Sequence, residues 1–159
     1  MNIQGSGIIA TDKRILNAAG RLLQVAALVY RNPGSSPEIL LITSRGTGRW
    51  IIPKGWPKAG KTLHDMALRE AFEESGIRGT VDPDPIGQFD YMKYDLPPEA
   101  IPSFTVNVYA VEFKRMAKTW PERGQRISEW VSPDEAADRV AEPELKHLLM
   151  NLPVQIYQK

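Results

Sequence analysis

Three glutamates crowded into one short segment constrain this chain more than any other feature of its sequence. Glu70, Glu73 and Glu74 lie within five residues of one another, between Thr62 and Gly76. On a helix these positions are neighbours, and each like-charged pair costs on the order of a few tenths of a kcal/mol. The crowding is explained either by a solvated acidic face or by a divalent cation that the carboxylates hold together.

The residues around these glutamates predict a helix with marked ends. Thr62 is a suitable N-cap with Asp65 three residues later, and Gly76 is a natural left-handed stop. At about 100° per residue, the small and aromatic residues fall on one side, and the glutamates fall roughly 140° away. We therefore expect one face to pack on a sheet while the carboxylates project elsewhere. The expected packing residues are Ala67, Leu68, Ala71 and Phe72.

A basic, glycine-containing loop directly precedes this helix. It carries Lys54, Lys58 and Lys61, and Gly55 allows the backbone to approach a neighbouring group closely. Taken alone, the loop is also consistent with a turn that bears solvated lysines. Cations beside a carboxylate cluster suit a complex of a metal ion with a polyphosphate. The loop and the helix together therefore predict such a site.

The composition limits the classes of protein to which the chain can belong. It has 159 residues, a net charge of +1 and no cysteine, which suits one domain in a reducing compartment and excludes disulfides and cysteine-bound zinc. The near-neutral charge argues against a nucleic-acid partner, and no segment approaches the ~18 apolar residues of a membrane span. We expect a cytoplasmic protein with an irregular arm at residues 1–20 and a single domain at residues 21–159.

Apolar segments separated by turn residues predict a sheet covered by helices. The expected strands lie at residues 22–30, 38–43, 50–52, 86–94, 104–113 and 125–131. Several of them are apolar enough to be buried on both faces of a sheet. Further helices are expected to begin at Ser132-Pro133 and after Pro143. The expected fold class is therefore α/β, with a mixed β-sheet between helices.

The central segment resembles the signature of the Nudix family, Gly-x5-Glu-x7-Arg-Glu-U-x-Glu-Glu-x-Gly-U, in which U is a bulky apolar residue. The matching positions are Gly55, Arg69, Glu70, Glu73, Glu74, Gly76 and Ile77. Two positions depart from the signature, because Ala71 replaces a bulky residue and Lys61 replaces the first glutamate. In the family that glutamate commonly forms a salt bridge with the arginine, so Lys61 would repel Arg69. The resemblance implies that the loop is held in another way or that Arg69 pairs with a different acid.

The same resemblance implies a Nudix-type α/β/α sandwich and a metal-dependent hydrolase of phosphoanhydride bonds. Glu70, Glu73 and Glu74 would bind Mg²⁺ or Mn²⁺, together with a backbone carbonyl near Lys54 and Gly55. Either Glu73 or Glu74 would help to deprotonate the attacking water. A more distant acid is often a further metal ligand in this family. The candidates for it are Glu112 first, and then Glu122 or Glu129.

Features outside the signature resemble the branch of diphosphoinositol polyphosphate phosphohydrolases, which also cleave diadenosine polyphosphates. They include the segments 43–45 and 48–55, and Trp120 followed by Arg126 and Trp130. By this resemblance, the partner is an anionic, polyphosphorylated small molecule held by basic side chains. The substrate-binding candidates are Arg45, Arg49, Lys54, Gly55, Lys58 and Lys61.

We therefore predict a pyrophosphohydrolase that acts by water attack on diphosphoinositol polyphosphates or on a related small molecule. The nearest alternative is a dinucleoside polyphosphate hydrolase with the same chemistry. A third candidate function is the removal of pyrophosphate from RNA 5′ ends, which the near-neutral charge of the chain does not favour. From a different class, a ligand-sensing module with a decayed site is supported by Lys61, whereas the three retained glutamates argue against it.

Overall fold

A long apolar strand, β3 (Leu22–Arg31), forms the middle of the fold. The computed structural model describes residues 9–11, 14–16, 21–92 and 103–157, and every β3 residue from 22 to 30 is buried. Successive side chains of a strand point to opposite faces, so Val25 and Ala27 lie in the core on one face of the sheet. Ala26 and Leu28 lie in the core on the other face. Both faces of the sheet therefore need cover.

The sheet around β3 is mixed, as the sequence predicts. β9 (Ser103–Met116) runs parallel to β3 along most of its length. β4 (Glu38–Thr43) pairs antiparallel with the end of β3, and β10 (Ser128–Val131) pairs antiparallel with β4. The shorter strands also pair antiparallel: β7 (Ile77–Val81) and β8 (Gly87–Met92) with β9, β5 (Trp50–Ile51) with β4, and β6 (Lys54–Gly55) with β3.

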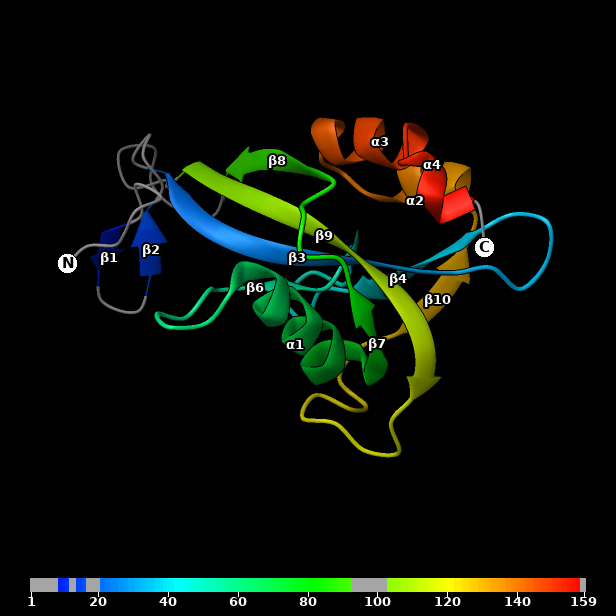
Figure 1. Ribbon diagram of the computed structural model, residues 1–159, viewed down its shortest axis with the longest axis horizontal. Coiled ribbons are helices and arrows are strands. Elements are labelled where there is room, and N and C mark those ends of the chain that lie inside the picture. Colours follow the sequence, from blue (N-terminus) through cyan, green and yellow to red (C-terminus); the bar gives the residue numbers. More distant parts are fainter. Residues whose placement is uncertain (1–8, 12–13, 17–20, 93–102, 158–159) are drawn as a thin grey trace.

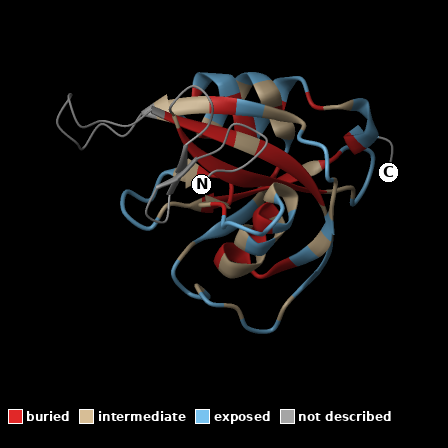
Figure 2. Cartoon of the chain, turned by 60° about the vertical axis from the view of Figure 1, so that its left-hand side comes forward, coloured by how far each residue is buried: buried red, intermediate tan, exposed pale blue. Residues whose placement is uncertain are grey.

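Helices cover the sheet on both faces (Figure 1). α1 (Leu63–Ser75) packs on the face that includes Val25 and Ala27. The other face is covered by α2 (Pro133–Arg139), α3 (Pro143–Met150) and α4 (Val154–Tyr157). Figure 2 shows buried strands in the middle and exposed outer surfaces on the helices. The predicted α/β sandwich with a mixed sheet is confirmed.

Differences from the sequence-based prediction lie mainly at the ends of elements. Residues expected in an irregular arm form an antiparallel pair, β1 (Ile9–Thr11) and β2 (Arg14–Leu16), and Leu16 pairs with Leu22. They form strands because the start of β3 offers backbone groups for pairing. β10 begins later than predicted because residues 121–126 form turns. The predicted loop at 96–102, and positions 93 and 94 of the predicted strand, lie outside the described residues.

The short α4 was not predicted from the sequence. Its four residues end the described chain, and Ile156 anchors it in the core beneath α2 and α3. Among the described residues, no helix is long and apolar enough to cross a membrane.

Both ends of α1 are formed by the residues that the sequence indicates. The N–H of Asp65 donates to the hydroxyl of Thr62 at 3.2 Å, which is an N-cap contact. Gly76 has a left-handed φ of 76°, and its N–H donates to the carbonyl of Phe72 at 2.8 Å. The indole ring of Trp120 occupies the space that a Cβ of residue 76 would need. Glycine is therefore required here both for the backbone conformation and for packing.

Replacing Gly76 with alanine should lower the free energy of unfolding by between about 1 and 3 kcal/mol. The substitution strains a left-handed residue and displaces the ring of Trp120. Urea unfolding followed by circular dichroism measures the change. Gly34→Ala is the matched control, because no atom lies within 4 Å of the position that its Cβ would take. Equal losses in the two variants would contradict this explanation.

Candidate active site

Two carboxylates of α1 lie one helical turn apart on its inner side. Glu74 is buried, with 7% of its surface exposed, and Glu70 is half-buried. The predicted separation of the glutamates from the packing face is therefore wrong for Glu74. Residues at i, i+4 and i+7 share a helical face, so Glu74 continues the buried row of Ala67 and Ala71.

The short strand β6 brings its backbone against these carboxylates. It pairs with β3, with Gly55 opposite Val25. The N–H of Lys54 donates to Oε1 of Glu74 at 3.3 Å. Gly55 lies so close to Glu70 that a Cβ on residue 55 would overlap its carboxyl group. A residue without a side chain is therefore needed at this position.

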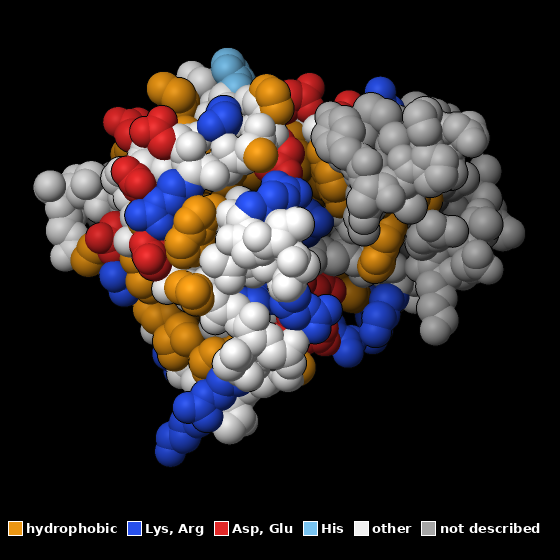
Figure 3. All heavy atoms as spheres, turned by 180° about the vertical axis from the view of Figure 1, so that it is seen from behind, with side chains coloured by type: hydrophobic (Ala, Val, Ile, Leu, Met, Phe, Trp, Pro, Cys, Tyr) orange, Lys and Arg blue, Asp and Glu red, His pale blue; other side chains and the backbone are white. Residues whose placement is uncertain are grey.

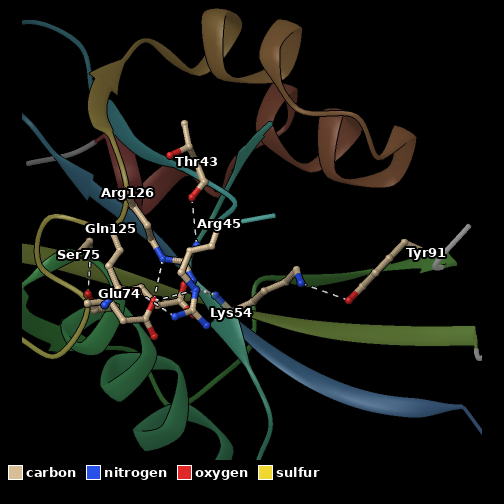
Figure 4. Close-up of polar contacts among 10 residues, drawn as sticks. Thr43, Arg45, Lys54, Glu74, Ser75, Tyr91, Gln125 and Arg126 are labelled. Carbon is tan, nitrogen blue, oxygen red and sulfur yellow. Dashed lines mark hydrogen bonds and ion pairs between the residues drawn. The ribbon is translucent and has the colours of Figure 1, made fainter. Parts of the chain in front are cut away.

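A buried arginine connects Glu74 to a second acidic segment. Arg126 has 8% of its side chain exposed, and its Nε donates to Oε1 of Glu122 at 2.9 Å. Its Nη1 donates to the carbonyl of Thr43 at 3.0 Å, and its Nη2 lies 3.7 Å from Oε2 of Glu74 (Figure 4). One guanidinium thus holds two carboxylates beside each other, although they come from α1 and from the loop before β10. The buried cation offsets only part of their negative charge.

Burial and mutual repulsion raise the pKa values of these acids. For Glu70 burial is the largest cause, and the charge of Glu74 and the hydrogen bond with it come next. Together with weaker effects of Glu73 and Glu122, they raise the pKa of the Glu70 carboxyl from 4.5 to about 8. Burial also raises the pKa of Glu74, against the opposing charge of Arg126. At neutral pH the pair therefore retains a proton, which an added positive charge would displace.

Glu73 has a different partner. The Nε of Arg69 donates to Oε2 of Glu73 at 2.7 Å, across one turn of α1. Lys61, which the sequence places in conflict with Arg69, is exposed on the loop before the helix. Lys61 in place of the signature glutamate left two possibilities open: the loop is held in another way, or Arg69 pairs with a different acid. The structure shows that Arg69 pairs with a different acid, Glu73.

Glu122 is the distant acid that the structure places at this site. Its Oε1 also lies 3.7 Å from Nε of Arg45. Glu112, the first candidate from the sequence, lies on β9 and pairs with Lys114 at 3.4 Å, and Glu129 lies on β10. The preference for Glu112 is corrected because the loop before β10 folds back onto the end of α1 and carries Glu122 with it.

The donors at this site suit a hard divalent cation, since Mg²⁺ prefers carboxylate oxygens. The charges of Glu74 and Glu122 raise the pKa of Glu70, and the charge of Glu122 also raises that of Glu74, as expected of acids that share a place for a positive charge. Across the described ranges, no three acidic or histidine side chains come close enough to enclose an ion as they stand. The predicted convergence of Glu70, Glu73 and Glu74 is therefore not seen, because Glu73 is bound to Arg69.

The candidate phosphate-binding residues fall into two groups. Arg45 lies at the carboxylate site (Figure 4), and Lys58 and Lys61 are exposed on the loop before α1. Arg49 is committed elsewhere, because its Nη1 lies 3.0 Å from Oε2 of the buried Glu142. Figure 3 shows Lys and Arg side chains gathered near the middle of one face, with acidic side chains beside them. Of the predicted phosphate-binding residues in these two groups, Arg45 and the loop lysines are thus better placed than Arg49 to meet an anion.

Lys54 connects the carboxylates to a group of aromatic side chains. Its ammonium group donates to the hydroxyl of Tyr91 at 3.2 Å (Figure 4). Tyr91 in turn donates to Oε1 of Gln24 at 2.6 Å, and its ring stacks on that of Phe104 with 4.7 Å between centroids. Burial, followed by the charge of Glu142, raises the pKa of Tyr91 to about 12. The phenol therefore stays protonated and can act as a donor.

A sequence model of the NUDIX domain matches residues 20–152. The chain belongs to the Nudix family. Nudix hydrolase 16, mitochondrial, from Arabidopsis thaliana is 29% identical over 119 residues, which cover 74% of this chain and 66% of that protein. The chain spans about half to two thirds of the length of the first curated relatives that it matches.

Solved structures show the same Nudix fold. The binary complex of a C. elegans Ap4A hydrolase has a TM-score of 0.61 at 20% identity, covering 80% of this chain and 92% of that chain. The E. coli dihydroneopterin triphosphate pyrophosphohydrolase has a TM-score of 0.65 at 14% identity, covering 84% and 95%. The predicted family and its α/β/α sandwich are confirmed. Membership of the family supports the prediction of a hydrolase that cleaves phosphoanhydride bonds.

Proposed function

We propose that the chain is a divalent-metal-dependent pyrophosphohydrolase that cleaves a phosphoanhydride bond by attack of water. Its substrate is a polyphosphorylated small molecule. The observation that carries the proposal is one group of acids, in which Glu74 and Glu122 share the guanidinium of Arg126 and both raise the pKa of Glu70. Shifted pKa values of this kind are typical of functional sites, and a cation would relieve the repulsion that causes them.

Each acid has a distinct part in this proposal. Glu70, Glu74 and Glu122 would hold Mg²⁺ or Mn²⁺, and Glu73 would be a further ligand if it left its salt bridge with Arg69. When bound, the ion supplies positive charge that neutralises phosphate oxygens and lowers the pKa of water. Glu74 accepts the proton of the attacking water, because Arg126 and a backbone N–H favour its ionised form.

The cations around the acids suggest a highly charged substrate. Arg45 faces the carboxylate site, and Lys58 and Lys61 extend from an exposed loop. Within the part of the chain that the structure describes, neither lysine contacts a carboxylate. Positive groups placed in this way stabilise the charge of a leaving phosphate. We therefore favour diphosphoinositol polyphosphates as the substrate class.

A dinucleoside polyphosphate is the second candidate, and one group of residues favours it. Trp56 is half-buried, and the centroid of its ring lies 5.7 Å from that of Phe104, close to the Tyr91 that binds Lys54. A nucleobase would find an aromatic surface there beside a phosphate-binding cation. The Ap4A hydrolase of C. elegans, which has this fold, is named for such a substrate.

A panel of substrates tests both candidates. The protein is incubated with Mg²⁺ or Mn²⁺ and with diphosphoinositol polyphosphates, diadenosine polyphosphates, nucleoside triphosphates, nucleotide sugars or triphosphorylated RNA, and the products are identified by mass spectrometry. We expect cleavage that EDTA abolishes, with the highest kcat/KM for diphosphoinositol polyphosphates. The highest value for diadenosine polyphosphates would establish the second candidate. Binding without cleavage of any compound would overturn the proposal in favour of a sensing module.

Gly55→Ala should lower kcat by about 100-fold, because the new methyl group displaces the Glu70 carboxylate. The protein should remain folded, since Gly55 is near the surface of the core rather than inside it. Steady-state kinetics and thermal unfolding are measured on the same preparation. Gly34→Ala is the control for adding a methyl group to a glycine. Full activity in Gly55→Ala would show that the position of Glu70 is unimportant for turnover.

Lys61→Glu should raise KM roughly fivefold for the most phosphorylated substrates, because an exposed charge contact is worth up to about 1 kcal/mol. The effect should shrink for substrates with fewer phosphates and at high salt. Lys118→Glu makes the same charge change at another exposed lysine and should leave KM unaltered. An unchanged KM in Lys61→Glu would remove residue 61 from the substrate-binding group.

A further inference from the structure

A cavity of about 560 Å³ opens between α1 and the place where β7 begins and β9 ends. Its lining includes none of Glu70, Glu74 or Glu122, so it is separate from the candidate active site. Small-molecule sites typically measure about 300–1,000 Å³, and this cavity falls within that range. Leu68 and Phe72, which the helical pattern assigns to the packing face, are only half-buried and line the cavity, and Leu68 also packs against the core as predicted.

Two arginines face each other across the strands at this cavity. Arg78 of β7 and Arg115 of β9 are direct partners in the antiparallel ladder, so their side chains leave the same face of the sheet. Both line the cavity and both are exposed. Within the described ranges, neither contacts a carboxylate. Like charges directly opposite each other are destabilising, and an anion between them would remove that repulsion.

The remaining lining makes the cavity both more positive and partly apolar. Lys114 and Arg69 also line it, each already paired with a glutamate, and Asp65 contributes the one acid among its lining residues. The guanidinium of Arg78 lies 3.7 Å from the centroid of the Phe72 ring. This contact holds the charge over an apolar surface at the cavity wall. A ligand that combines an anionic end with an apolar or planar part matches this lining.

We propose that this cavity binds a small organic phosphate, with the phosphate between Arg78 and Arg115 and the organic part against Leu68 and Phe72. Planar guanidinium groups donate two parallel hydrogen bonds to phosphate oxygens, which fits the paired arginines. The volume leaves room for more than a phosphate group, and a nucleoside diphosphate has the required chemistry. Binding here needs neither a metal ion nor hydrolysis, so it stands independently of the proposed function.

Calorimetric titration with ADP, and separately with orthophosphate, tests this site. EDTA is present throughout, so that no metal ion can hold a phosphate at the carboxylate site. We expect ADP to bind with a Kd below about 1 mM, and about tenfold more tightly than orthophosphate because of the apolar wall. Absence of ADP binding would overturn the proposal. Equal affinities for the two probes would overturn the assignment of an organic ligand.

Variants then locate the binding. Arg78→Gln and Arg115→Gln should each weaken ADP binding about tenfold, as expected for loss of a charge-assisted hydrogen bond, and the double variant should bind no ADP detectably. Arg123→Gln, at an arginine outside the cavity, and Glu74→Gln should both retain the parent affinity. Arg115→Gln relieves repulsion, so its unfolding temperature should not fall, whereas Arg78→Gln also loses the contact with the Phe72 ring. ADP binding by the double variant with the parent affinity would place the ligand elsewhere.

Discussion

Replacing Glu74 with glutamine should lower kcat by about 1,000-fold and leave the fold intact, since loss of a general base costs between about 100- and 10,000-fold. In the proposed function Glu74 is the proton acceptor, because the N–H of Lys54 donates to its Oε1 and Arg126 lies 3.7 Å from its Oε2. Both contacts favour its ionised form. The amide keeps the volume and the contact with Lys54, but it takes no proton. Phosphate release with the best substrate measures the change.

Two further variants make this result specific. Glu73→Gln should lower kcat only about tenfold, as expected for a supporting ligand, because Glu73 is bound to Arg69 and stands apart from the buried pair. Glu135→Gln, on the exposed surface of α2, should have no effect. A larger loss in Glu73→Gln than in Glu74→Gln would assign the proton transfer to Glu73. Activity of Glu74→Gln within about threefold of the parent would exclude it as the proton acceptor.

The elements that hold the site are predictable because each has a local signature. Thr62 and Gly76 mark the ends of α1, and both cap contacts are present. The apolar run at residues 22–30 predicts a strand buried on both faces, and β3 has that burial. Capping and periodicity depend on residues a few positions apart, so they can be judged from sequence alone.

Contacts between distant segments were not predictable in the same way. Arg126 reaches Glu74 only because the loop before β10 folds back onto α1. The spacing of four residues between Glu122 and Arg126 was the one local signal in the sequence for the group of Glu74, Glu122 and Arg126. Glu112 ranked first among the distant acids, but the register of β9 places it opposite Tyr30, away from β6. Register and loop folding arise from tertiary packing, which the pattern of a single segment does not contain.

The departure at residue 61 has a consequence for the whole site. A lysine there leaves Arg69 without the acid that the family signature supplies, and Arg69 binds Glu73 instead. That contact resolves the conflict of charge on the loop. It also withdraws one carboxylate from the group formed by Glu70 and Glu74. In the proposed function, a metal ion at this site would compete with the guanidinium of Arg69 for Glu73 as its third ligand on α1.

Without a divalent cation, the free energy of unfolding should fall as the pH rises from about 5 to about 8. The pKa of Glu70 is raised from 4.5 to about 8 in the folded protein, chiefly by burial and by Glu74. Between these values the folded state holds a proton that the unfolded chain has released, so raising the pH favours unfolding. The slope from this proton is at most about 1.4 kcal/mol per pH unit. Below pH 4.5 both states hold the proton, and the destabilisation disappears.

Mg²⁺ or Mn²⁺ should oppose this loss and should stabilise the protein most at about pH 8. A cation binds the carboxylates only after the proton has left and only in the folded state, so its effect grows with pH. Urea unfolding at about pH 5, 6.5 and 8, with EDTA or with the metal, measures both trends. Glu70→Gln should reduce both the fall in the free energy of unfolding with pH and the stabilisation by metal, whereas Glu135→Gln should leave both unchanged. The other titrating groups are common to parent and variant. An identical pH profile in Glu70→Gln would therefore show that Glu70 does not carry this proton. The proposed metal site would then lose its main physical support.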